Sequence, residues 1–406
     1  MTRKRVFIFG AGAEVDGLEM PLGDALPIRI YKYVKSPEGK QFSESIKRMF
    51  GIRGFSYAKL IEDRIDEMFK DFTHNTDEIL ASFEGINIDS VQIRFARSFV
   101  SALSSLGRNI RFSTREEELQ SIRESNETFA SEDYNSIDLI NVDKLEFSKY
   151  AHNLYYRFLT MFLNSESNEL DILSTMFSVT FSYEKLLADN FVGLISGNKS
   201  ARDRYIYLSW LLWGFLSSLE DEKKNDTIVS VYNKLNMSTD DYIVTMNYTR
   251  FVDFSFKPSR IIHFHSSLDS YVVLGTNTHI EEAFSDNLES YKERFDSLNN
   301  LKRGNNMPIV IPSMMPPMDV KPLLSNKYLE RWADAQAKII NADELIVVGY
   351  SFNPKDMHFN DIIFNTKARK ITIVSIDDSI AECIPESLRT RVKYETGRAI
   401  DCIQSI

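Results

Sequence analysis

A five-residue apolar strand that runs straight into a glycine turn places narrow limits on the fold of this chain. Residues 5–9, Arg-Val-Phe-Ile-Phe, are followed at once by residues 10–13, Gly-Ala-Gly-Ala. Glycine lets backbone N–H groups approach a phosphate closely, and a helix that begins after such a turn adds partial positive charge. The segment therefore predicts a nucleotide site at the first strand. A hydride-transfer enzyme is disfavoured, because its fingerprint requires a third glycine and position 15 is Val15.

The bulk properties of the chain favour a globular protein and argue against several other classes. The chain has 406 residues, 43% of them hydrophobic, and a net charge of −10. This charge argues against a general nucleic-acid coat, while a local basic groove, and with it a DNA contact, stays open. The longest apolar stretch, residues 205–219, is shorter than the roughly 20 residues that a membrane span needs. The apolar run at the N-terminus is too short for a signal peptide, so we predict a cytoplasmic protein without a membrane segment.

Strand-like runs lie at the two ends of the chain. They are residues 6–9, 242–246, 260–265, 271–274, 308–311, 345–349 and 371–376. Near-continuous apolar runs are typical of strands that are buried on both faces of a parallel sheet. Residues 328–340 repeat apolar side chains at helical spacing, so we expect the strands on either side of them to form a β-α-β unit. The pattern predicts an α/β fold with a Rossmann-like, doubly wound parallel sheet.

The middle of the chain has a different pattern. Residues 42–236 are rich in Phe, Leu, Glu and Lys at helical spacing. We predict a large helical insertion domain there, which splits a sheet domain made of residues 1–41 and 237–406. Within this middle part we expect an aromatic stripe to be core: Tyr205, Tyr207, Trp210, Trp213 and Phe215.

Polar residues follow three of the later strands. Asn247 follows residues 242–246, His265 ends the next strand, and Ser351 comes two residues after Gly349. In an open parallel sheet, ligands bind beyond the carboxyl ends of the strands, so these ends are expected to face one ligand together with the glycine turn. His263 lies two residues before His265 on the same face, and we expect it to have a structural role.

In this order the segments resemble the sirtuin-like NAD-binding family, and especially its bacterial anti-phage defence branch. The resemblance covers both ends of the chain and rests on residues 10–13, 245–248, 265–269 and 349–352 with Asp356. This chain departs from many relatives at three positions. It has Glu14 where they have Ser, Ser266 where they have Gly, and Thr249 where they often have Asp.

The resemblance implies roles for individual residues. Asn247 would hold the ribose or position the attacking water, and His265 would act as general base toward a ribose hydroxyl or that water. Cleavage of the nicotinamide–ribose bond passes through an oxocarbenium-like state with a leaving group that is already cationic, so orientation and one base are sufficient. Asn247 and Asp356 each have an alternative role as a helix cap. The residues expected to bind NAD+ are Gly10, Ala11, Gly12, Ala13, Glu14, Gly349, Ser351, Asp356 and, at the adenosine ribose, Asp377.

The number of cysteines favours one reaction of this family. Sirtuins that remove acyl groups from lysine usually carry a four-cysteine zinc ribbon, whereas this chain has only Cys383 and Cys402. A deacylase is therefore disfavoured, and no zinc is expected. The favoured hypothesis is hydrolysis of NAD+ to nicotinamide and ADP-ribose, as an effector of anti-phage defence that depletes NAD+.

An effector of this kind must be silent until it is triggered, yet the sequence contains no obvious sensor domain or P-loop. We therefore predict control by homo-oligomerisation or by a separate partner chain, such as a hexameric translocase-type ATPase. Two alternatives stay open. One is a non-catalytic NAD+- or ADP-ribose-sensing scaffold that recruits a nuclease or ATPase, which the departures at Glu14 and Ser266 would favour. The other is transfer of ADP-ribose to a macromolecule.

Overall fold

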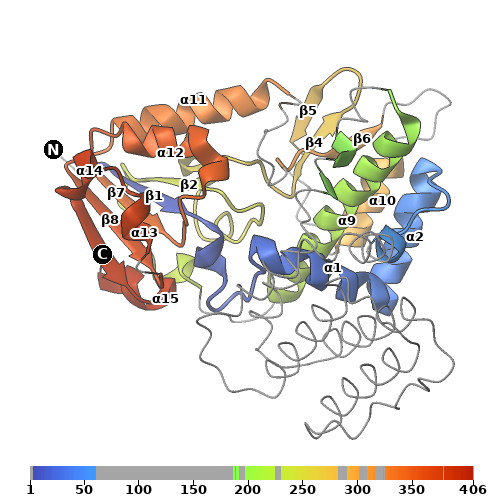
Figure 1. Ribbon diagram of the computed structural model, residues 1–406, viewed down its shortest axis with the longest axis horizontal. Helices are drawn as coiled ribbons and strands as arrows, with labels where there is room; N and C mark the ends of the chain where they lie inside the picture. The colour runs from blue at the N-terminus through green and yellow to red at the C-terminus, as the bar shows by residue number, and fades with distance from the viewer. Residues whose placement is uncertain are drawn as a thin grey trace, which may run out of the picture. The chain divides into compact units, whose positions relative to one another are not determined.

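The computed structural model describes residues 3–60, 186–187, 189–191, 197–224, 230–281, 290–300, 309–315, 323, 325–377 and 379–405 (Figure 1). Contacts divide the chain into two compact units. The first consists of Met1–Gly23, Tyr33–Gly54 and Glu184–Ile406, and the second of Asp24–Lys32 and Phe55–Tyr183. Most of the predicted helical domain lies outside the described residues, so its boundaries at residues 42 and 236 stay a prediction. Every element of the candidate site lies in the first unit.

A six-stranded parallel sheet forms the centre of the first unit. Its strands are β1 (Arg5–Phe9), β2 (Tyr242–Thr245), β3 (Ile261–His263), β7 (Glu344–Val348), β8 (Lys370–Ser375) and β9 (Val392–Thr396). They lie in the order β3-β2-β1-β7-β8-β9, and every neighbouring pair is parallel. Counted along the chain within this sheet, the order is 3-2-1-4-5-6, which is that of the dinucleotide-binding Rossmann fold. The predicted α/β fold class is confirmed.

Both faces of this sheet are covered. Residues 6–9 of β1 are each at most 2% exposed, as expected for a strand buried on both sides. On one face, α11 (Lys327–Ile340) and α12 (Met357–Phe364) share a core with the strands and with α13 (Ile380–Cys383) and α14 (Glu386–Arg389) (Figure 1). Elsewhere in this unit, Phe9 packs against Tyr232 of the short helix η4 (Tyr232–Lys234), and α15 (Ala399–Cys402) contacts β8 and η1 (Ala11–Glu14).

A second, antiparallel sheet corrects one sequence prediction. It contains β4 (Ser270–Val273), β5 (Thr278–Glu281) and β6 (Val310–Pro312), in the order β5-β4-β6. Residues 308–311 were expected to enter the parallel sheet through a β-α-β unit with α11 and β7, and this expectation is wrong. The strand β6 pairs with β4 instead, where Trp210 donates a hydrogen bond to the Val310 carbonyl. Val310 and Ile311 are therefore buried in this second sheet and not in the parallel one.

The helix α9 (Lys199–Lys224) packs beside this second sheet, together with α2 (Pro37–Phe50) and α10 (Tyr291–Asn300). Its aromatic stripe is buried as predicted. The Trp213 indole donates a 2.6 Å hydrogen bond to the Leu268 carbonyl, which joins α9 to the segment before β4. None of the helices that the structure describes is both long and apolar enough to cross a membrane.

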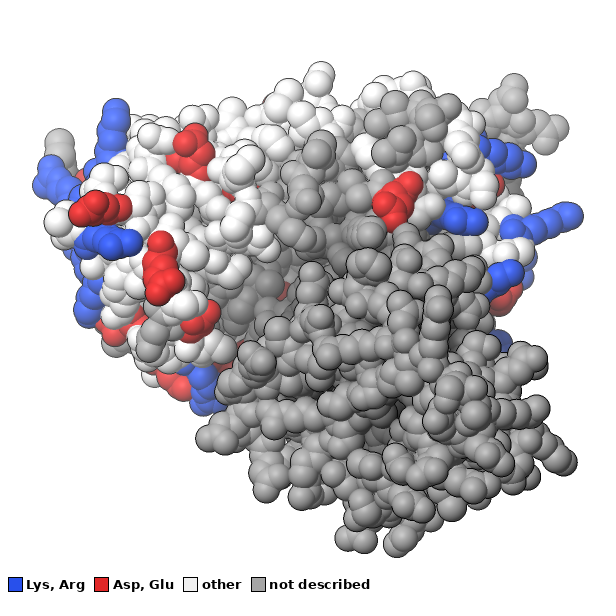
Figure 2. Space-filling view, in the orientation of Figure 1, with Lys and Arg blue, Asp and Glu red and all other residues white. Residues whose placement is uncertain are grey.

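The remaining described elements are short. They are α1 (Leu26–Lys35) and the 3-10 helices η2 (Gly23–Ala25), η5 (Pro258–Arg260), η6 (Pro354–Asp356) and η7 (Ile403–Ser405). On the face shown in Figure 2, acidic and basic side chains are interspersed around the six-stranded sheet. This mixture agrees with the modest acidic balance of the whole chain.

Candidate functional site

Two turns meet at the carboxyl ends of β1 and β7, where the strand order of the sheet reverses. The Gly10 and Gly12 N–H groups donate to the Val348 and Gly349 carbonyls, at 3.0 and 2.9 Å. Gly349 has a φ of +62°, and a Cβ atom there would lie 2.2 Å from the Ala13 nitrogen. These glycines therefore allow the two turns to cross at close range. Ala11, between Gly10 and Gly12 in the sequence, is exposed.

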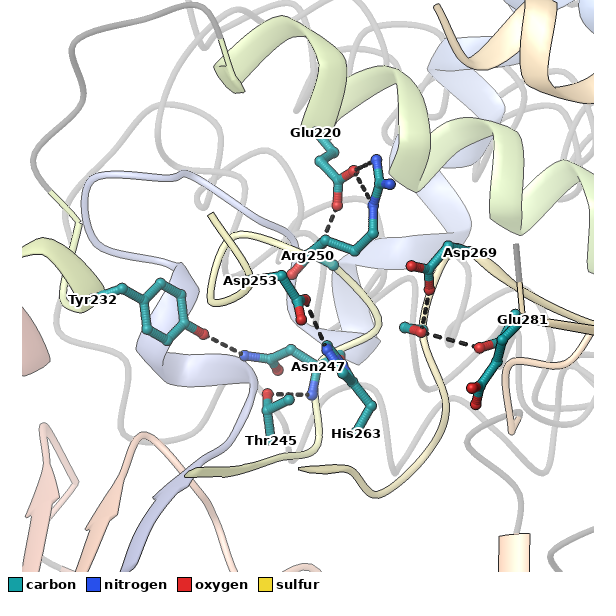
Figure 3. Close-up of polar contacts among 12 residues, drawn as sticks. Glu220, Tyr232, Thr245, Asn247, Arg250, Asp253, His263, Asp269 and Glu281 are labelled. Atoms are coloured by element: carbon teal, nitrogen blue, oxygen red, sulfur yellow. Dashed lines mark hydrogen bonds and ion pairs between the residues drawn. The ribbon is translucent and has the colours of Figure 1, made fainter. Parts of the chain in front are cut away.

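Asn247 follows β2 at the same edge of the sheet and is 8% exposed. Its side-chain nitrogen Nδ2 donates to the Gly10 carbonyl at 3.2 Å and to the Tyr232 hydroxyl at 3.4 Å (Figure 3). A carbonyl only accepts hydrogen bonds, so the contact with Gly10 determines which way the amide points. The amide oxygen Oδ1 accepts no hydrogen bond from the described residues and is the atom left for a ligand. The side chain thus ties the glycine turn to η4 and does not cap a helix.

Glu14 lies next to this amide and is 2% exposed. Its Oε1 accepts a hydrogen bond from the Tyr232 hydroxyl at 2.7 Å, and its Oε2 accepts one from the Thr249 hydroxyl at 2.5 Å. Burial raises the pKa of Glu14, although hydrogen bonds from Thr249, Tyr232 and Asn247 work in the opposite direction. Both carboxylate oxygens are thus engaged within the chain. The predicted contact of Glu14 with NAD+ stays a prediction.

His263 lies on the other side of Asn247 (Figure 3). Its Nε2 is 2.8 Å from Asp253 Oδ2, and its Nδ1 is 3.3 Å from the Asn247 carbonyl oxygen. Burial alone would lower the pKa of His263, but the hydrogen bond and charge of Asp253 outweigh it and raise this pKa. These contacts fit the structural role that the sequence predicts, because they hold the backbone of Asn247.

His265 and Asp356 form a second pair at this edge. His265 follows β3, is 7% exposed, and has its Nε2 3.6 Å from Asp356 Oδ1. Asp356 is the N-cap residue of α12, but its side chain makes no capping hydrogen bond, so the carboxylate faces the imidazole instead. Ser266 has a φ of +72°, a conformation that glycine adopts without strain. Ser266 therefore makes a glycine-like turn after His265.

The other predicted site residues lie at the ends of β7 and β8. Ser351 is exposed two residues after Gly349. Asp377 is also exposed, and its carboxylate accepts hydrogen bonds from the Ser379 hydroxyl and backbone N–H at 2.8 and 2.9 Å. These bonds, that from the hydroxyl first, hold the pKa of Asp377 below its usual range.

Sequence reasoning missed Tyr232 and Asp253. Tyr232 lies in a short 3-10 helix with no periodic pattern, and its contact with Glu14 spans 218 positions of the chain. The aromatic ring of Tyr232, which packs against Phe9, indicated burial but not a role in the site. Asp253 sits in a turn after β2, where an acidic residue is common at the surface.

Among the residues that the structure describes, no three His, Cys, Asp or Glu side chains come together as a metal site. Cys383 is exposed in α13 and Cys402 is partly buried in α15. The expectation that zinc is absent stays a prediction.

No protein-family model matches the chain, and no curated protein matches its sequence. Solved structures do match in part. A Sir2 enzyme is 14% identical, with 48% of this chain and 72% of that chain covered and a TM-score of 0.33. A mutant Sir2 homologue in complex with ADP-ribose is 14% identical over 57% and 80%, with a TM-score of 0.35. A Sir2 protein bound to a myristoylated histone peptide is 15% identical over 47% and 75%, with a TM-score of 0.29. The fold assignment itself rests on the strand order of the six-stranded sheet.

Proposed function

We propose that this protein is an NAD+ glycohydrolase, which breaks the nicotinamide–ribose bond of NAD+ and releases nicotinamide and ADP-ribose. One observation carries the proposal. The Asn247 amide, anchored on Gly10, and the His265–Asp356 pair lie beyond the carboxyl ends of neighbouring strands, beside the point where the strand order reverses. A sheet of this order binds dinucleotides at that point.

The chemistry needs few groups. As the bond from nicotinamide to the ribose carbon breaks, its electron pair leaves with nicotinamide, and positive charge develops on the sugar. The Asn247 oxygen accepts a hydrogen bond from the attacking water or a ribose hydroxyl and so orients it. Water bonds to the same ribose carbon and gives its proton to His265, while Asp356 orients the imidazole and stabilises the imidazolium that forms.

The biological part of the proposal rests on the sequence resemblance. The protein would act in the cytoplasm as an anti-phage effector that depletes NAD+, without zinc. Residues 1–41 and 237–406 would hold NAD+, and residues 42–236 would form the helical insertion domain. The enzyme would be silent until infection and would be controlled by homo-oligomerisation or by a separate partner chain, such as a hexameric translocase-type ATPase.

The test is release of nicotinamide from NAD+ by the purified protein, over a concentration series and with extract of phage-infected cells. We expect turnover in the wild type and loss of turnover in Asn247→Ala and His265→Ala. His279→Ala serves as control, because His279 lies on β5 of the second sheet and should leave turnover unchanged. Full activity in either site variant would contradict the proposal. NAD+ binding without any product would favour the sensing scaffold, and label retained on a macromolecule would favour ADP-ribosyl transfer.

A further inference from the structure

We propose that Glu14 is a positioning residue for Asn247. It holds the amide oxygen of Asn247 toward the ligand through the Tyr232 hydroxyl and through its own hydrogen bond with the amide. The inference rests on the proposed function, since Asn247 is taken there to orient the water or the ribose. It gives Glu14 a role that differs from direct contact with NAD+.

The hydrogen bonds between these residues have a fixed direction. Tyr232 has a single hydroxyl proton, which it donates to Glu14 Oε1. Its oxygen is then free to accept, and it accepts from Asn247 Nδ2. The second proton of that amide group goes to the Gly10 carbonyl. The Asn247 amide also hydrogen-bonds to Glu14 directly. The NH2 group therefore faces Gly10, Tyr232 and Glu14, and Oδ1 is turned away from them.

The environment of Glu14 favours such a role over a purely structural ion pair. Among the described residues, no Lys or Arg forms a salt bridge with its carboxylate, which is held instead by the hydroxyls of Tyr232 and Thr249 and by the amide of Asn247. A buried carboxylate without a cation is costly, so a chain has little reason to keep one for stability alone. A neutral amide or an apolar side chain would fill the same space without that cost.

Other charged groups surround the cluster and belong in any pH experiment. Glu220 of α9 acts on Glu14 through its negative charge, and the His263–Asp253 pair lies on the far side of Asn247. The helix α15, which contacts η1, brings Asp401 and Cys402, and Arg398 just before it pairs with Asp401. The effect of Glu14 must therefore be isolated by substitution at Glu14 itself.

The first arm of the test measures kcat and KM for NAD+ in three variants. Glu14→Gln keeps the shape and removes the charge, and Tyr232→Phe keeps the charge and cuts the connection to Asn247 that runs through the Tyr232 hydroxyl. We expect both to lower kcat by about 10- to 100-fold, since a small misplacement of a reacting group has effects of this order. KM should stay within about threefold of the wild type, because the orientation of Asn247 by Glu14 acts in the transition state.

Glu344→Gln is the matched control. Glu344 is also a buried glutamate, 4% exposed, but it begins β7 at the opposite edge of the sheet and pairs with Arg3 and Lys370. Its kcat and KM should equal those of the wild type. Unchanged kcat in Glu14→Gln would overturn the inference, and unchanged kcat in Tyr232→Phe would overturn the part of it that runs through the Tyr232 hydroxyl. A raised KM with unchanged kcat in Glu14→Gln would also overturn it, because it would mean that Glu14 binds NAD+ directly.

The second arm does not depend on turnover. The side-chain NH2 signals of Asn247, assigned by their loss in Asn247→Asp, are followed by NMR from about pH 5 to about pH 9. We expect them to shift with the titration of Glu14 in the wild type and to lose that shift in Glu14→Gln. Signals that titrate equally in both proteins would refute the coupling. If the wild type shows no turnover, the proposed function is wrong, while this arm still decides whether Glu14 sets the amide.

Discussion

Gly349→Ala tests whether the two crossing turns, and not the left-handed backbone alone, require glycine. At this position an added Cβ atom would lie 2.2 Å from the Ala13 nitrogen and 2.5 Å from the Gly12 carbonyl carbon. Both neighbours are backbone atoms, so one turn must move by most of an ångström. The left-handed conformation costs a residue other than glycine about 1–2 kcal/mol, and overpacking adds about 1–3 kcal/mol. The expected loss of unfolding free energy is therefore about 2–5 kcal/mol.

Gly51→Ala supplies the matched control. Gly51 ends α2 with a φ of +65°, nearly that of Gly349, but an added Cβ atom there meets nothing within 4 Å. Its expected cost is about 1–2 kcal/mol, from the backbone conformation alone. The difference between the two variants isolates the contact between the turns.

Tryptophan fluorescence during urea unfolding is the appropriate assay, because all three tryptophans, Trp210, Trp213 and Trp332, belong to the first unit. Both glycines also lie in that unit. Gly349→Ala should show the lower urea midpoint of the two, and its Gly12 amide should lose protection from hydrogen exchange. Equal midpoints would refute the reasoning, since they would mean that the added methyl group is accommodated without moving either turn.

Three further predictions concern stability. Burial raises the pKa of folded Glu14, so the stability that its bound proton contributes is complete below the ordinary Glu pKa and is lost as pH rises through the raised value. Over that pH range, the urea midpoint of Glu14→Gln should therefore rise relative to that of the wild type. Trp213→Phe removes the hydrogen bond to the Leu268 carbonyl and should cost about 1–3 kcal/mol, measured by circular dichroism in urea. Because Asp253 raises the pKa of His263, the stability from their pairing is complete below the ordinary His pKa and is lost above the raised one. The difference in urea midpoint between the wild type and Asp253→Asn should therefore shrink as pH rises through that window.

The parallel sheet was predictable because its strands carry the signal locally. Residues 6–9 and 345–348 are continuous apolar runs, and both are buried on two faces of the sheet. A polar residue directly after such a run marks the carboxyl edge of the sheet, which is where Asn247 and His265 lie. The apolar period of residues 328–340 likewise gave α11 nearly to its ends.

The second sheet was not predictable in the same way. Val310 and Ile311 are apolar and buried. A strand buried against α9 and a strand buried in the parallel sheet both need such a short apolar run, so the sequence does not distinguish them. The edge strands β5 and β9 were missed because their exposed polar residues, such as Lys393, weaken the apolar pattern. Pairing of strands is decided by contacts distant in sequence, which a local pattern does not contain.

The glycines show how one sequence signal has two physical sources. Gly10 and Gly12 were read as a phosphate cradle, yet their N–H groups donate to the end of β7, and their missing side chains make room for Gly349 and Tyr350. A glycine pattern indicates that another group approaches the backbone closely. Only the fold shows that part of this group is the chain itself, at Gly349 and Tyr350.

Glu14 and Thr249 are in direct contact, because Glu14 accepts a 2.5 Å hydrogen bond from the Thr249 hydroxyl. A carboxylate and a hydroxyl can therefore be exchanged between these two positions by substitution. The exchange would keep one carboxylate at this contact. Thr249→Asp alone would place a second carboxylate against the first, where like charges repel strongly, and Glu14→Ser alone would remove the carboxylate that accepts from Tyr232 and Thr249.

The double variant Glu14→Ser/Thr249→Asp restores a single carboxylate and one hydroxyl, so it should unfold at a higher urea midpoint and turn over NAD+ faster than either single variant. Residues in direct contact show coupling energies of about 0.5–3 kcal/mol, and the sign expected here is favourable. Strictly additive effects of the two substitutions, on stability and on turnover alike, would show that the contact between these side chains is incidental. A double variant that recovers stability but not turnover would mean that the position of the carboxylate, and with it the orientation of Asn247 through Tyr232, matters beyond its charge.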